Sequence, residues 1–182
     1  MNRHMIFSAV AGLVLALLLL LPAGGLAGEE EAATGRGAEL PPPVENLSQR
    51  EKCPVCGMFV ARYPEWISQL HLDDGKAHHF DGMKDLLAYY FNPEKFGGRA
   101  DAVVKAIWAK DYYTLQWVEA RQAWFVVGSR VHGPMGHEFI PLASREAAEA
   151  FMRDHQGEEI MTFDEITAER VQNMRTGHRM GR

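Results

Sequence analysis

The sequence contains only two cysteines among its 182 residues, and both lie in one C-x-x-C pair, Cys53 and Cys56. Two adjacent cysteines are too few to staple a fold with disulfides. Outside the cytoplasm, such a pair can oxidise to a disulfide or bind a soft metal. The cysteines therefore indicate chemistry at one place in the chain rather than a disulfide framework.

The chain also lacks a basic block and the short motifs of common enzymes. Lys and Arg total 19 against 24 Asp and Glu, which gives a formal net charge of -5. A negative charge that is spread without basic clusters argues against nucleic acid as a partner. The sequence has no nucleophile elbow, phosphate loop or carboxylate pair at catalytic spacing, so we predict a protein without catalytic turnover.

No apolar run reaches the length that a membrane-spanning helix needs. The longest extends from Ile6 to about Leu21 behind Arg3, in the layout of a secretory signal peptide, and it is shorter than the roughly 20 residues that cross a bilayer. Small residues in Gly25-Leu26-Ala27 predict cleavage after residue 27, with an uncleaved anchor as the alternative. Because no cysteine lies near the end of the run, we expect no lipid anchor on a leader cysteine.

Composition divides the rest of the chain into three parts. Residues 28–50 are rich in Glu, Gly, Ala and Pro and predict a disordered or extended, flexible tether. Apolar periods begin near Cys53 and predict one folded domain over 51–170. Residues 171–182 are basic and polar, and we predict a disordered tail that carries Met174, His178 and Met180.

The apolar periods predict an α+β domain. The first part should contain a strand over 66–72, a turn at 73–76, a strand over 77–80 and a helix capped by Asp81, with Met83 in the core. The expected later elements are strands at 103–109, 114–118 and 123–127, an extended stretch at 135–142, a helix capped by Ser144, a strand at 159–163 and a helix from about Asp164. The order repeats, so we predict two related β-plus-α halves, about 51–100 and 101–170.

Sulfur is concentrated in Cys53-Pro54-Val55-Cys56-Gly57-Met58, which places two thiols and one thioether within six residues. Soft sulfur ligands select soft metals, and Cu(I) is the soft ion most available to an envelope protein. Glycine at position 57 lets the backbone fold so that the sulfurs of Cys56 and Met58 face one point. We therefore predict a Cu(I) site at this motif.

A second sulfur lies in the segment 133–138, where Met135 stands among turn residues rather than on a helical stripe. Methionines of a hydrophobic core usually belong to a periodic element, and this one does not. If the two halves pack with their loops together, Met135 and His137 would complete a site that begins at Cys56 and Met58.

Three other interpretations of the C-x-x-C pair stay open. A structural zinc site would need further ligands, for which only histidines such as His78 and His79 are available. A thiol-disulfide oxidoreductase would use Cys53 and Cys56 as its redox pair, but such motifs open a helix and residues 57–60 look extended. A structural disulfide would close a very short loop and gain little stability.

The ordered set of motifs along the chain resembles the NosL family, copper chaperones associated with nitrous oxide reductase maturation. The resemblance covers about Glu51 to Ile166. It is carried by Cys-Pro-Val-Cys-Gly-Met-Phe-Val at 53–60, Trp66, Asp-Gly at 74–75, Phe80-Asp81, Lys84-Asp85, Tyr89-Tyr90, Phe-Val-Val-Gly-Ser at 125–129, Pro-Met-Gly at 134–136 and Phe-Asp-Glu-Ile at 163–166.

This resemblance implies two similar ββαβ-type halves, Cu(I) as the bound ion and an accessory role beside nitrous oxide reductase and an ABC-type transporter. Cys56, Met58 and Met135 match the family's sulfur positions, and Cys53 and His137 are candidate extra ligands. The family's usual lipoprotein cysteine is absent, and Cys53 is present where many members have only the second cysteine. We expect an exported metallochaperone of the periplasm or the outer face of the envelope.

Overall fold

The computed structural model of the chain describes residues 39–177. The predicted signal peptide, the beginning of the predicted tether, His178 and Met180 lie outside the described residues. Between residues 39 and 177, no helix is both long enough and apolar enough to cross a membrane.

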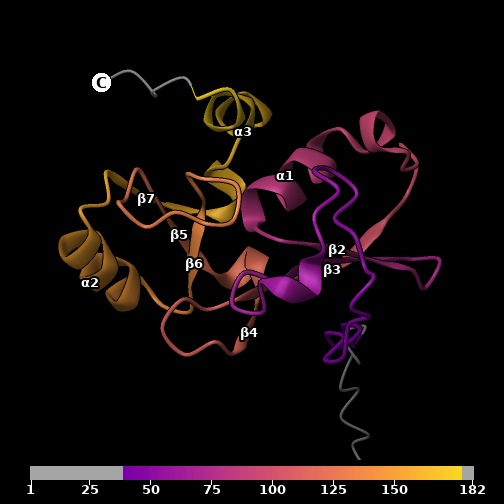
Figure 1. Cartoon of the computed structure of the whole chain (residues 1–182). Helices are drawn as coiled ribbons and strands as arrows, with labels where there is room; N and C mark the ends of the chain where they lie inside the picture. Colours follow the sequence, from indigo (N-terminus) through magenta and orange to yellow (C-terminus); the bar gives the residue numbers. More distant parts are fainter. Residues whose placement is uncertain (1–38, 178–182) are drawn as a thin grey trace, which may run out of the picture. The chain divides into compact units, whose positions relative to one another are not determined.

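The first sheet is antiparallel and has the strand order β2-β1-β3-β4. Figure 1 shows helix α1 above β2 and β3. Its strands are β1 (Ser68–Leu72), β2 (Ala77–Phe80), β3 (Val104–Lys110) and β4 (Trp117–Glu119). Helix α1 (Met83–Phe91) connects β2 to β3 and packs on β1 and β2. The predicted hairpin is confirmed, since Ser68 pairs with Phe80, and Met83 is buried as predicted.

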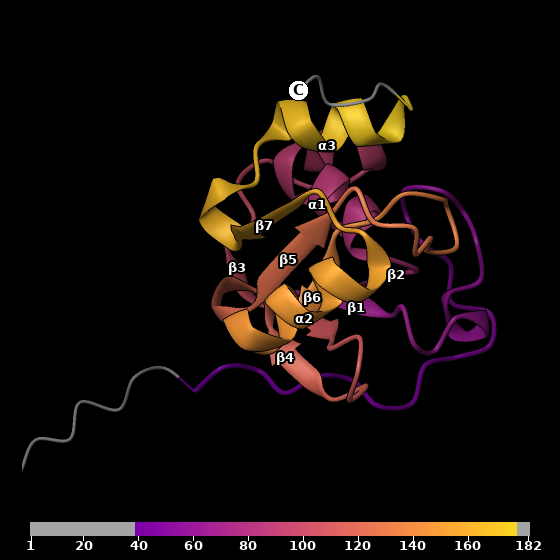
Figure 2. The same cartoon turned by 90° about the vertical axis from the view of Figure 1, so that its left-hand side faces the viewer.

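The second sheet repeats the same element order at smaller scale. Its strands β5 (Trp124–Val127), β6 (Ile140–Leu142) and β7 (Glu159–Thr162) are antiparallel in the order β6-β5-β7. Helix α2 (Arg145–His155) lies against this sheet (Figure 2), and α3 (Ala168–Arg175) packs on α1. The chain therefore runs ββαβ twice, which confirms the α+β class with two similar halves.

The boundary between the two halves lies later in the chain than predicted. We expected the second half to begin near residue 101, but β3 pairs with β1, and β4 pairs with β3. The change of sheet falls at the 3-10 turn Ala120–Gln122, directly before β5. The predicted boundary was wrong because apolar periodicity identifies a strand but does not indicate which strand it pairs with.

One of the three predicted helix starts is confirmed and two differ. Ser144 caps α2 as expected, because its Oγ accepts the N–H of Ala147 at 3.1 Å. Helix α1 instead begins after Gly82 without a side-chain cap, so the assignment of Asp81 as a cap is wrong. The last helix begins at Ala168, behind a 3-10 turn at Phe163–Glu165.

Both ends of the described chain are more ordered than their composition suggested. Gln69 is fully buried and binds both backbone groups of Val44, through Oε1 at 2.8 Å and Nε2 at 2.7 Å. Trp108 Nε1 donates to the carbonyl of Pro41 at 2.9 Å. Residues 41–45, which we predicted to be part of a flexible tether, are therefore held against the first sheet. Met174 of the predicted polar tail is buried in α3.

Candidate metal centre

The two cysteines occupy a tight turn that follows residues 41–45 in the chain and precedes the first strand, β1. Gly57 N–H donates to the Cys53 carbonyl at 2.9 Å, and Cys53 N–H donates to the Met58 carbonyl at 2.9 Å. Gly57 has a φ of +79°, a left-handed conformation that favours glycine. The local fold thus brings Cys53, Cys56 and Met58 around one short loop, as the motif predicted.

Backbone N–H groups of this loop point at the sulfurs. Cys53 Sγ accepts from the N–H groups of Cys56 and Val55, and Cys56 Sγ accepts from that of Met58. Hydrogen bonds to the charged form of a thiol stabilise its thiolate. The loop therefore offers two sulfurs to a cation with part of the thiolate charge already balanced by the backbone.

Two buried carboxylates complete a four-membered cluster. Cys56 Sγ donates to Asp81 Oδ1 at 3.2 Å, and Cys53 Sγ donates to Asp85 Oδ2 at 3.7 Å. One candidate ligand atom from each of these four residues lies within 4.8 Å of the others. The sequence interpretation missed Asp81 and Asp85 as members of a site, because it assigned Asp81 to the cap of the helix.

Burial sets the protonation of the cluster. It raises the pKa of Cys53 to about 12, and it raises the pKa of Cys56 still further, with the hydrogen bond to Asp81 acting in the same direction. Burial also raises the pKa of Asp85. Without a metal, both cysteines are therefore free thiols near neutral pH, and a bound ion must displace their protons.

The segment that carries Met135 is fixed to the start of α1. Gly133 and Gly136 exchange two backbone hydrogen bonds, at 2.8 and 3.0 Å, which close the turn. Lys84 Nζ donates to the carbonyls of Met135 at 2.6 Å and His137 at 2.7 Å. These contacts hold the loop of Met135 beside α1. The residue after Lys84 in that helix is Asp85, a member of the cluster.

A buried carboxylate reinforces this connection. Glu138 Oε1 accepts the backbone N–H groups of Lys84 at 2.5 Å and Phe139 at 2.9 Å. A Cβ at Gly82 would collide with the Glu138 carboxylate, so the absence of a side chain there lets the two halves approach. From the sequence, Lys84 was noted only as part of a family motif, and no role was predicted for Lys84 or Glu138.

The structure brings some of the predicted ligands together and leaves others apart. Cys53 and Cys56 share the cluster, and Met58 lies half-buried in the same loop. Met135 is 47% exposed, and its loop reaches α1 through backbone carbonyls. His137 is exposed, with its ring against His132. Ligation by the two methionines and by His137 therefore stays a prediction.

The sequence pattern of the NosL family matches residues 43–171, which include the whole cluster and both sheets. The chain belongs to the NosL family. Its two-sheet fold agrees with a NosL crystal structure, that of the copper chaperone NosL from Shewanella denitrificans. That comparison gives a TM-score of 0.60 at 28% identity and covers 71% of this chain and 99% of the other.

Curated NosL relatives carry names that describe binding rather than catalysis. The copper-binding lipoprotein NosL of Stutzerimonas stutzeri is 28% identical over 161 residues, 86% of this chain and 80% of that protein. The copper-binding lipoprotein NosL of Achromobacter cycloclastes is 28% identical over 124 residues, 62% of this chain and 61% of that protein. Both are named lipoproteins, whereas we predicted a cleaved leader without a lipid anchor, in a part of the chain outside the described residues.

The other interpretations of the cysteine pair fit this NosL fold poorly. His78 Nε2 is hydrogen-bonded to the Tyr89 hydroxyl, and His79 Nδ1 to Glu51 Oε1, each at 3.0 Å, so neither joins the cysteines in the cluster. An oxidoreductase needs a thiol whose pKa is lowered, usually at a helix N-terminus. Here the motif is a turn, and burial raises the pKa of both thiols.

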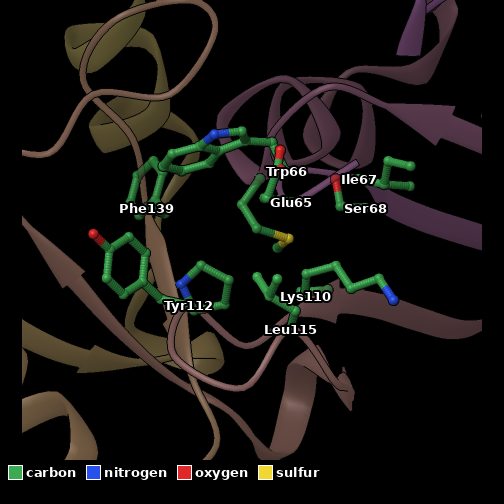
Figure 3. Close-up of a pocket in the computed structure, with 11 residues that line it drawn as sticks. Glu65, Trp66, Ile67, Ser68, Lys110, Tyr112, Leu115 and Phe139 are labelled. Carbon is green, nitrogen blue, oxygen red and sulfur yellow. The ribbon is translucent and has the colours of Figure 1, made fainter. Parts of the chain in front are cut away.

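A cavity of about 280 Å³ lies apart from this chemistry. Figure 3 shows the rings of Trp66, Tyr112 and Phe139 around it, and Glu65 and Lys110 supply charged groups to its lining. Its lining includes neither cysteine nor histidine. This cavity therefore offers a metal ion no thiol or imidazole ligand.

Proposed function

We propose that this NosL chain is a Cu(I) chaperone of the cell envelope, which holds the ion at the Cys53–Cys56 turn and passes it to a partner protein. The pairing of two thiols in one preformed loop is the observation that carries the proposal. Thiolate and thioether ligands suit Cu(I), and relatives of the chain are named copper-binding proteins.

Sulfur rather than oxygen is the proposed donor. Carboxylates suit hard ions such as Mg²⁺ and Ca²⁺, so we assign Cu(I) to Cys56, Met58 and Met135, with Cys53 as an additional ligand. Asp81 and Asp85 then serve the ion-free state, in which they accept hydrogen bonds from the two thiols. His137, the remaining candidate ligand, is exposed and contacts His132.

A low coordination number suits delivery. An open position lets a ligand of the recipient enter before the first sulfur leaves, whereas a closed cage of four ligands would retain the ion. The proposed recipient is a copper-accepting client, for which the family resemblance suggests nitrous oxide reductase or its ABC-type maturation transporter. Export to the periplasm is supported by the pattern of the leader and by the lipoprotein names of the relatives.

The function is tested by its metal preference and by proton release. We expect one Cu(I) per chain, bound far more tightly than Zn(II), which rarely accepts thioethers. Because burial raises the pKa of both thiols, they are protonated at neutral pH and binding must release protons. The apparent association constant should therefore rise with pH, about tenfold per pH unit for one thiolate and about a hundredfold for two.

Competition with a Cu(I) chelator under anaerobic, reducing conditions, repeated from about pH 6 to about pH 8 and corrected for the chelator's own protonation, measures both quantities. The slope counts the thiolates that bind the ion, and so reports whether Cys53 joins Cys56. An affinity that does not change with pH, or zinc binding of equal strength, would contradict a sulfur-bound Cu(I).

Met135→Leu tests whether the second half contributes a ligand. The swap keeps size and apolarity at a half-exposed position, so the free energy of unfolding should change by less than about 1.5 kcal/mol. Loss of the thioether should weaken Cu(I) binding at least about tenfold, or about 1.4 kcal/mol. Met83→Leu, on the buried face of α1, is the matched control and should leave Cu(I) affinity unchanged. Full affinity in Met135→Leu would confine the site to the loop 53–58.

A further inference from the structure

Six histidines lie in the described part of the chain, and four of them are already engaged. His71 Nε2 is hydrogen-bonded to Gln69 Oε1 at 3.0 Å, and His155 packs its ring on Phe151 and Tyr112. His78 and His79 have the partners given above. His132 and His137 differ from these four. Both side chains are exposed, and no nitrogen of either ring is hydrogen-bonded to another described residue.

The rings of these two imidazoles are in edge-to-face contact across one turn. The ring centroids of His132 and His137 are 4.7 Å apart, with an angle of 78° between the ring planes. Consider an ion about 2.0 Å from one nitrogen of each ring, with an angle of about 90° between the two ion–nitrogen bonds. The two ring centroids then lie about 4.5 to 5 Å apart. The observed spacing of 4.7 Å lies within this range, so the two rings can serve as neighbouring ligands in a square arrangement.

The turn between the histidines is rigid enough to hold that spacing. The two Gly133–Gly136 hydrogen bonds close it, and Lys84 Nζ fixes the carbonyl of His137 itself. The backbone that carries both rings is thus anchored to α1 before any ion arrives. Binding would cost only the ordering of two exposed side chains.

We propose that His132 and His137 form a second metal site, specific for Cu(II) and separate from the Cu(I) site at the cysteines. Imidazole nitrogen in tetragonal geometry suits Cu(II), which also leads the divalent first-row ions in affinity for such ligands. Water would fill the remaining positions of an exposed site. The proposal goes beyond the proposed function, because it needs none of the sulfur ligands and assigns His137 to a different ion.

The test uses the full chain with Cys53→Ser and Cys56→Ser, so that no thiol can reduce the added ion. Titration with Cu(II) sulfate, followed by electron paramagnetic resonance, should give a tetragonal signal with splitting from two imidazole nitrogens. Adding His132→Gln and His137→Gln should remove that splitting and weaken the binding at least about tenfold. His155→Gln in the same serine background is the matched control and should retain both.

Three results would overturn the proposal. The two-nitrogen signal could persist after His132→Gln and His137→Gln, which would place the Cu(II) elsewhere in the chain. Zn(II) could displace Cu(II) at equal concentration, which would contradict the assigned ion. With both cysteines intact, the same histidine substitutions could weaken Cu(I) binding more than about twofold, which would make the histidines part of the sulfur site. Failure of Cu(I) binding in the unaltered chain would instead reject the proposed function and leave this site standing.

Discussion

Cys56→Ser should lower Cu(I) affinity at least about a hundredfold, which corresponds to about 2.8 kcal/mol. Cys56 lies in the loop between Cys53 and Met58 and is the sulfur that every version of the proposed ligand set contains. A serine hydroxyl is a hard oxygen that stays protonated at neutral pH, so it cannot replace a soft thiolate. It can still donate a hydrogen bond to Asp81 Oδ1, as the thiol does at 3.2 Å. The fold should therefore survive while the site is lost.

Chelator competition measures the affinity, and thermal unfolding of the ion-free protein checks that the fold is unchanged. Cys53→Ser is the matched comparison in the same loop. If both sulfurs bind the ion, this variant also weakens binding and reduces proton release from two protons to one. If Cys56→Ser bound Cu(I) as tightly as the unaltered chain, the ion would have to reside away from the Cys53–Cys56 turn.

Much of the fold could be predicted because local patterns determine it. The hairpin of β1 and β2 follows from apolar residues on both sides of an Asp-Gly turn, and Ser144 caps α2 through its own side chain. The position of β3 could not be obtained in this way. Its seven residues read as a strand, but only the pairing of Ser68 with Ala109 assigns them to the first sheet.

The candidate site was predictable where its chemistry is concentrated in one segment. The spacing of Cys53, Cys56 and Met58 predicted one loop, and the structure forms it. Asp81 was interpreted as a helix cap because an aspartate before a helix usually has that role. Its carboxylate instead meets the Cys56 thiol, a contact between residues 25 positions apart that local sequence cannot indicate.

The contact between the two halves was equally hidden in the sequence. A lysine followed by an aspartate on a helix, and a glutamate after a histidine, look like ordinary surface residues. In the structure Lys84 and Glu138 are buried to 5% and 4% exposure and join α1 to the loop of Met135. The hydrogen bonds of these two buried side chains therefore tie the loop of Met135 to α1, the helix that carries Asp85.

Burial also gives Glu138 a pH-dependent role in stability. It raises the pKa of this carboxyl from 4.5 to about 8. Between these two values the folded protein holds a proton that the unfolded chain releases, so the contribution of Glu138 to stability falls as pH rises through this window. Glu138→Gln cannot ionise and should remove this dependence. As the pH rises toward 8, the free energy of unfolding of the unaltered protein should therefore fall relative to that of Glu138→Gln.

Glu138→Ala should be the most destabilising single change, with a loss of about 3 to 5 kcal/mol in the free energy of unfolding. The N–H groups of Lys84 and Phe139 would both lose their acceptor, and the carboxylate would leave a cavity beside Gly82. Glu138→Gln keeps an acceptor oxygen and nearly the same volume, so it should lose less than half as much. Urea unfolding near neutral pH compares the two variants. Equal losses would contradict the assignment of this stabilisation to the two hydrogen bonds and the volume of the Glu138 side chain.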